Sequence, residues 1–171
     1  MPNGYLGLVQ RFPGKITLID LQGNPQGEIK PTVPGSDFFG LYDCFPNGKD
    51  QLTMAGGTFK QNGTTGGIEI NFVSNFRAEG EELVRLTEIR TESDYSNFNF
   101  KEDEKEEINF RKVAVGPDGR VYVSRTRNSY EIHVYNSDGS LDRIIEREYE
   151  HRKRTDKEYQ EVFDLAEAQL S

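Results

Sequence analysis

The sequence predicts an all-β fold built from antiparallel meanders of up to four strands, followed by a short helix. Stretches in which apolar and polar residues alternate, as they do in strands, are separated by tight turns that contain Asn-Gly or Asp-Gly. The same order of strand, turn and strand returns three times along the 171 residues, which is typical of a repeat protein. A chain of this length can bury one ordinary core.

The first copy of the repeat, residues 1–30, starts at its turn. Pro2-Asn3-Gly4 leads into an alternating stretch, and the strand-like Ile16–Leu21 is followed by a second turn at Gly23. Because no strand precedes the first turn, this copy is predicted to be partial, with three strands.

The second copy, residues 38–90, carries a long insertion. A strand over Phe39–Phe45 precedes a Pro-Asn-Gly turn, and Ile68–Val73 repeats the third strand of the unit. The turn glycines of this copy lie further apart than in the other copies, and the excess falls in residues 56–67 (GGTFKQNGTTGG). This composition predicts a flexible loop.

The third copy, residues 108–147, is the most regular. Val113–Val115 and Val121–Val123 flank a Pro-Asp-Gly turn, in which proline fixes one φ angle and glycine accepts a positive one. Two further strand-like stretches, Tyr130–Asn136 and Leu141–Ile145, are joined by an Asn-Ser-Asp-Gly turn. The sequence therefore predicts a four-stranded meander.

Two segments lie outside the copies. The connection over residues 87–107 is long and acidic, and its tail, 101–107, predicts a solvated loop or short helix, with a site for an ion or basic partner as the alternative. Residues 155–170 predict a surface helix docked against the sheets, because Thr155 and Glu158 form a capping box before an apolar stripe. The stripe consists of Tyr159, Val162, Phe163 and Ala166.

The amino-acid sequence around the turns, PDGRVYVS followed by IHVYNSDGS, resembles the NHL-type repeats of six-bladed β-propellers, a group that includes TolB-like and gluconolactonase-like proteins. The resemblance is good over residues 110–146, fair over 1–30 and weak over 38–90. It implies that each copy is a blade and that the chain is a propeller segment, with a β-sandwich or an open meander sheet as the alternatives. Two full blades and a partial one cannot close a ring of about 4 to 8. Further blades are therefore expected from a longer parent chain or from self-association.

Charge and composition exclude some partners and leave the compartment open. With 29 acidic and 21 basic residues the net charge is -8, which repels nucleic acid and anionic lipid. No apolar run approaches the roughly 18 to 20 residues of a membrane span. The first residues lack a secretory signal, although for a fragment this says nothing about the parent, which could be extracytoplasmic in bacteria. The single cysteine excludes an intrachain disulfide.

The expected function is non-enzymatic binding of a protein or small-molecule ligand, because loops held by a rigid frame commonly carry function. The candidate ligand-binding residues are Asp43, Asn62, Asp94 and Asp103. The resemblance implies an alternative, a metal-dependent hydrolase or lactonase of the gluconolactonase-like kind, in which carboxylates and amides of inner strands hold a divalent cation. In this chain Asp43 is the one charged residue on a predicted inner strand. No catalytic residue and no set of metal ligands is predicted.

The cysteine and the histidines have simpler interpretations than catalysis. Cys44, His133 and His151 could assemble a thiol nucleophile and a base. Cys44 alternates with Tyr42 on a predicted strand, however, so a packed thiol is expected. His133 is expected to face solvent or a neighbouring blade, and His151 to lie in a solvated run of mixed charge.

Overall fold

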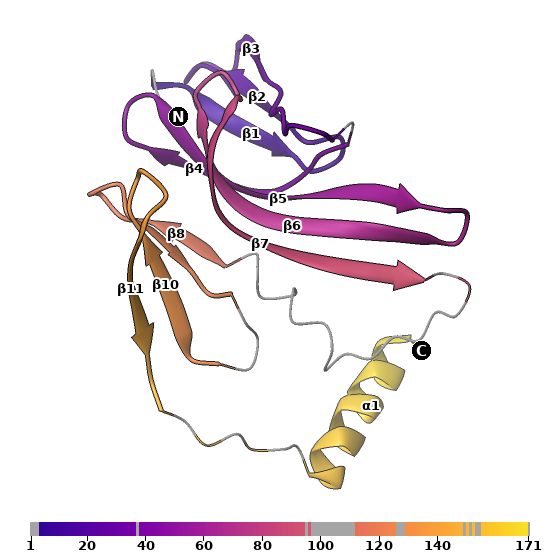
Figure 1. Cartoon of the computed structure of the whole chain (residues 1–171). Coiled ribbons are helices and arrows are strands. Elements are labelled where there is room, and N and C mark those ends of the chain that lie inside the picture. Colours follow the sequence, from indigo (N-terminus) through magenta and orange to yellow (C-terminus); the bar gives the residue numbers. More distant parts are fainter. Residues whose placement is uncertain are drawn as a thin grey trace.

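The computed structural model describes residues 4–36, 38–94, 96, 112–125, 129–148, 150, 152 and 155–170. Within them the chain forms three antiparallel sheets and one helix, which confirms the predicted all-β class with a short C-terminal helix (Figure 1). Strands that are consecutive in the sequence are neighbours in each sheet, so every sheet is a meander.

The first sheet has three strands, and the second and third have four each. The first contains β1 (Leu6–Gln10), β2 (Lys15–Ile19) and β3 (Pro25–Ile29). The second contains β4 (Gly40–Asn47), β5 (Gln51–Asn62), β6 (Gly66–Arg77) and β7 (Glu82–Asp94). The third contains β8 (Val113–Val115), β9 (Val121–Val123), β10 (Glu131–Tyr135) and β11 (Leu141–Glu146), and α1 (Asp156–Leu170) follows it.

One apolar core joins the three sheets, because both outer sheets pack against the middle one. Ile16 of the first sheet and Val121 and Val123 of the third are fully buried in the same cluster as Phe72 and Phe76 of β6. Alternation along each strand explains this arrangement, since every second side chain of a strand points to the same face.

Buried polar groups join the second sheet to the third. Asn47 Nδ2 donates to Thr53 Oγ1 at 3.0 Å, and that hydroxyl donates to Asn75 Oδ1 at 2.7 Å. Asn75 Nδ2 in turn donates to the carbonyl oxygen of Ser137, in the β10–β11 turn, at 3.1 Å. The chain of hydrogen bonds fixes where the third sheet lies on the second, because buried polar groups left unpaired are costly.

The turn glycine Gly139 is required for the same contact. Its φ is +90°, a conformation that other residues rarely adopt, and a Cβ atom there would lie 2.4 Å from Val84 Cγ2. Glycine therefore serves both the turn and the close approach of the β10–β11 turn to β7.

Two expectations about loops are wrong. The insertion over residues 56–67 is not a flexible loop, because β5 and β6 pair without interruption from Gln51↔Arg77 to Asn62↔Gly66. The acidic connection also begins later than expected, since β7 extends to Asp94. The tail 101–107 lies outside the described residues.

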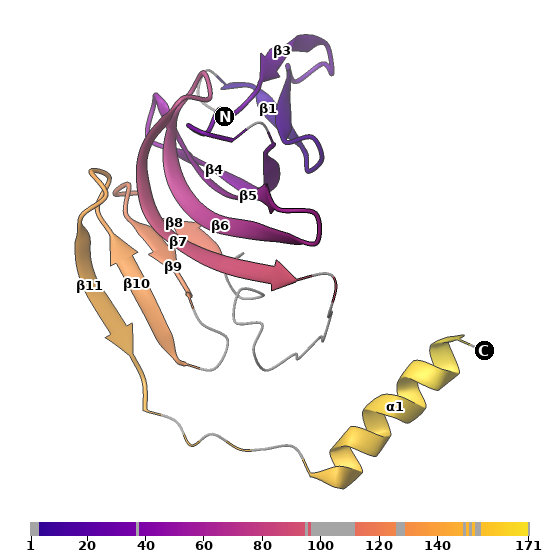
Figure 2. The same cartoon turned by 45° about the vertical axis from the view of Figure 1, so that its right-hand side comes forward.

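The helix forms where the sequence predicts it but does not dock on the sheets. Its capping box is present, with the Thr155 amide donating to Glu158 Oε2 at 2.8 Å and the Glu158 amide directed at Thr155 Oγ1. Its apolar side chains are nevertheless exposed, Phe163 by 66%, and α1 lies apart from the sheets in both views (Figure 2). The expectation of a docked helix is therefore wrong for this structure.

The three sheets follow one another in chain order and do not close into a ring (Figures 1 and 2). No helix among the described residues has the length and apolarity that crossing a membrane requires.

Candidate functional site

The face of the third sheet that points away from the second sheet is partly apolar, and part of it is exposed, although Val134 in the middle of β10 is only 1% exposed. The strand register shows which side chains share this face. One row of paired residues crosses all four strands, and a second row pairs a residue of β10 with one of β11. Ile132 and Ile145 are 39% and 47% exposed. We call this surface the β8–β11 outer face, and it comprises Ala114, Tyr122, Ile132, Val134, Arg143 and Ile145.

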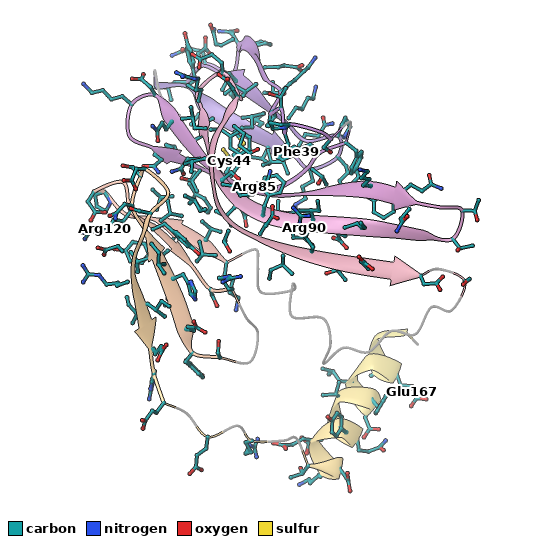
Figure 3. All side chains as sticks on the ribbon, viewed as in Figure 1. Phe39, Cys44, Arg85, Arg90, Arg120 and Glu167 are labelled. Atoms are coloured by element: carbon teal, nitrogen blue, oxygen red, sulfur yellow. The ribbon has the colours of Figure 1, made fainter. Side chains whose placement is uncertain are left out.

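Basic residues surround this apolar centre. Lys112, Arg120 and Arg147 continue the alternation one residue beyond the strands, and their main chains are hydrogen-bonded to Ser124, Gly116 and Tyr130 respectively. Arg143 Nε binds Asp142 Oδ2 at 2.7 Å, and Arg120 lies between Asp118 and Asp142. Figure 3 shows Arg120 at the turn end of the third sheet. Four basic residues therefore occupy outward positions, and two of them pair with Asp118 in the β8–β9 turn and Asp142 in β11.

A second exposed face belongs to the first sheet, at the opposite end of the stack that the three sheets form. Leu6 pairs with Ile19 and Leu8 with Thr17, and these four residues make the β1–β2 outer face. Leu6 is 49% and Leu8 55% exposed, whereas Ile16 on the inner face is fully buried. Both ends of the stack thus expose large aliphatic side chains.

A hollow of about 470 Å³ lies at the end of β10 and β11 that leads toward α1. It is lined by Ser129, Tyr130, Glu131, Glu146, Arg147 and Glu148. Its lining is mainly acidic, and Arg147 belongs to both the hollow and the rim of the β8–β11 outer face.

Three polar side chains form a row on the inner face of β10. His133 Nε2 lies 2.7 Å from Glu131 Oε1, and the hydroxyl of Tyr135 lies 3.5 Å from His133 Nδ1. The hydrogen bond from His133, together with the charge of nearby Arg125, keeps the pKa of Glu131 below its ordinary value. His133 is buried. Of the two positions expected for it, the one facing solvent is therefore wrong, and the one facing a neighbouring sheet agrees with its burial.

This row is not arranged for nucleophilic catalysis. Ser129 Oγ binds Glu131 Oε2 at 3.3 Å, so the carboxylate stands between the hydroxyl and the imidazole. A serine nucleophile needs the imidazole next to the hydroxyl, with the carboxylate behind it. None of the three residues was among the predicted ligand-binding residues, although Glu, His and Tyr at alternate positions of one strand are the sequence signal of such a row.

A second polar cluster, around Arg85, is satisfied within itself. The guanidinium lies 4.1 Å from the centre of the Phe72 ring and binds Glu82 and Glu88 at 2.8 and 2.9 Å. The bond from Arg85 keeps the pKa of Glu88 low. Figure 3 shows Arg85, Phe39 and Cys44 in the region where the first two sheets meet. These contacts make the cluster part of the packing.

The structure brings two of the predicted ligand-binding residues to one end of the second sheet. Gly66 pairs with both Asn62 and Asp94, so these lie about 10 Å apart, one strand on either side of it. Asp94 Oδ1 accepts bonds from the amide and hydroxyl of Ser96, which lower the pKa of Asp94.

The other two predicted residues do not join this pair. Asp43 pairs with Ala55 of β5, and Ala55 pairs with Val73 of β6. Val73 is seven residues along β6 from Gly66, so Asp43 lies about 23 Å along the sheet from the Asn62–Asp94 pair. Asp103 lies outside the described residues. Among the residues that the structure describes, no group of three or more His, Cys, Asp or Glu could hold a metal ion.

Cys44 is a packed thiol, as expected. It lies against the core opposite Met54, and burial raises its pKa to about 12. A thiol with so high a pKa is a poor nucleophile at neutral pH. His151 lies outside the described residues.

No protein-family model matches the chain, and no curated protein is significantly similar to it. The resemblance to NHL repeats therefore depends on the turn sequences and the order of the strands.

Proposed function

We propose that this chain is a non-enzymatic binding module, a segment of an NHL-like β-propeller whose uncovered sheet faces bind further protein. The observation that carries the proposal is the pair of exposed outer faces, with Leu6 and Leu8 at one end of the stack and Ile132 and Ile145 at the other. Fully burying one such side chain stabilises an assembly by about 1.5 to 3 kcal/mol. Burying either face against another protein surface would therefore stabilise the complex between them.

The order of the sheets supports the propeller part of the proposal. Each sheet is a meander that packs on the next sheet in chain order, as blades do, and an added sheet on either outer face would continue the pattern. Blades bury their apolar faces only against neighbouring blades. The sheet that covers each face belongs either to a longer parent chain or to another molecule.

The geometry favours binding over catalysis. The gluconolactonase-like alternative needs several oxygen ligands around one ion, whereas Asp43 lies far from Asn62 and Asp94 in the second sheet. The Glu131–His133 pair lacks a nucleophile in the necessary order. The outer faces are, by contrast, preformed surfaces of the kind that marks protein association.

Light scattering coupled to gel filtration tests the proposal. We expect the measured mass to exceed the 19.5 kDa of a single chain and to rise with concentration. Leu8→Glu and Ile145→Glu should each reduce the association, because a charge would then be buried with an apolar face. Leu21→Glu is the control, since Leu21 is 76% exposed in a turn and belongs to neither face. A compact monomer at all concentrations, insensitive to either substitution, would refute the proposal.

A further inference from the structure

We propose that α1 of one copy docks on the β8–β11 outer face of a second copy. This inference rests on the proposed function, because it names the occupant of one of the two uncovered faces. Two partly exposed apolar surfaces support it, one on the acidic helix and one with four basic and two acidic residues around it.

The helix presents an apolar stripe that is at least half exposed. Tyr159, Val162 and Phe163 are spaced by three and four residues, so they share one side of α1, and they are 50%, 50% and 66% exposed. A helix of this length gains most of its stability from packing such a stripe. The stripe therefore calls for a partner surface.

The helix is also strongly acidic. Asp156–Leu170 contains five acidic residues and one lysine, and its last turn has no basic residue. Glu167, labelled on α1 in Figure 3, flanks the stripe four residues after Phe163. Any surface that covers the stripe must therefore accept negative charge beside it.

The β8–β11 outer face has the complementary properties. Ile132 and Ile145 form its exposed apolar part, and the four outward basic residues described above surround them, two of which are paired with Asp118 and Asp142. The whole chain carries a net charge of -8, so a face with basic residues at its outward positions differs from the average surface. Complementary charge of this kind fixes register and partner choice at an interface.

The placement of the helix points to a second copy as its source. In both views α1 projects from the end of the third sheet and lies apart from the sheets of its own chain (Figures 1 and 2). Arg152 and the capping box bind Glu158, which fixes the start of the helix. Each copy thus offers one helix and one receiving face. Two copies related by a two-fold axis can exchange helices, so that both contacts form at once.

The experiment measures solution mass for four chains: wild type, Phe163→Glu, Arg143→Glu and a control, Lys157→Glu. Lys157 is an exposed residue on the side of α1 away from the stripe. We expect wild type and the control to be dimers of twice 19.5 kDa. Phe163→Glu and Arg143→Glu should each weaken the dimer by about tenfold or more. Circular dichroism should show unchanged strand content in all four, whereas the helix signal should fall together with the dimer in the two weakened variants, because α1 is then left without a packing partner.

Mixing the two weakened variants separates exchange between copies from docking within one chain. The intact helix of Arg143→Glu can dock on the intact face of Phe163→Glu, so the mixture should form a heterodimer through one contact. A mixture that stays monomeric, or a Phe163→Glu variant as dimeric as wild type, would overturn the inference.

The outcomes also separate this inference from the proposed function. Association that survives Phe163→Glu but is lost in Leu8→Glu or Ile145→Glu would support sheet-to-sheet binding and overturn docking by the helix. A wild-type monomer at every concentration would overturn both.

Discussion

Replacing Asn75 by alanine should destabilise the fold more than any loss of packing volume explains, because Asn75 connects the second and third sheets. Its side chain is fully buried, accepts a bond from Thr53 Oγ1 at 2.7 Å and donates one to the Ser137 carbonyl at 3.1 Å. A net hydrogen bond contributes about 1 kcal/mol, and a buried group left without a partner costs about 1 to 3 kcal/mol. The Thr53 hydroxyl would lose its acceptor, whereas the carbonyl of exposed Ser137 would regain water. The expected loss is therefore about 2 to 3 kcal/mol.

Urea unfolding, followed by circular dichroism, measures this loss. The control Asn62→Ala removes an exposed asparagine at the end of β5 and should change the free energy of unfolding by less than about 0.5 kcal/mol. Replacing both partners of the Thr53–Asn75 bond, with Thr53→Val and Asn75→Leu together, should cost less than the sum of the single changes, since neither partner of that bond is then left unpaired and only the Asn47 amide loses its acceptor. An Asn75→Ala variant as stable as the Asn62→Ala control would refute the reasoning.

Three further predictions concern local features. Gly139→Ala should cost about 2 to 4 kcal/mol in a urea titration, because the new Cβ would meet Val84 at 2.4 Å at a φ of +90°, whereas Gly23→Ala, with a φ of +88° and no atom within 4 Å, should cost about 1 kcal/mol. Hydrogen bonds hold the pKa of Glu158 at about 2, below its ordinary 4.5, so its capping contribution should be constant above pH 4.5 and disappear as pH falls through 2. Helical circular dichroism should follow this course, and Glu158→Gln should abolish it. Because burial raises the pKa of Cys44 to about 12, its reaction with a maleimide at neutral pH should be about a thousandfold slower in the folded chain than in urea, and equal rates would contradict its burial.

The turns and the order of strands could be predicted from the sequence, because glycine marks them directly. Gly48, Gly80, Gly119 and Gly139 all have positive φ and stand at turns that the repeat predicts. The extent of β5 and β6 could not be predicted from composition. Glycine-rich residues there pair as strands, and the Phe59 ring covers Gly67, where an added Cβ would lie 2.1 Å from the ring. An aromatic ring over a cross-strand glycine stabilises a strand that intrinsic preference disfavours.

The candidate site was predicted less well than the fold. Asn62 and Asp94 were chosen as loop residues, and they come together only because two long strands end at the same edge of the second sheet. The Glu131–His133–Tyr135 row was visible as alternate residues of one predicted strand. Its burial was not, because burial depends on how the third sheet packs on the second, and no local pattern contains that information.

The alternation of the outer strands explains why their uncovered faces matter. In β10 the inward positions include His133 and Tyr135, yet the outward positions hold Ile132 and Val134, so both faces of the strand are suited to burial. In β1 the outward residues are likewise leucines. Strands with apolar residues on both faces are typical of sheets covered on both sides. A sheet face that stays in contact with water normally carries polar side chains instead. The sequence of the end strands therefore specifies a second covering layer, and for the third sheet the acidic, apolar α1 has the chemistry to provide it.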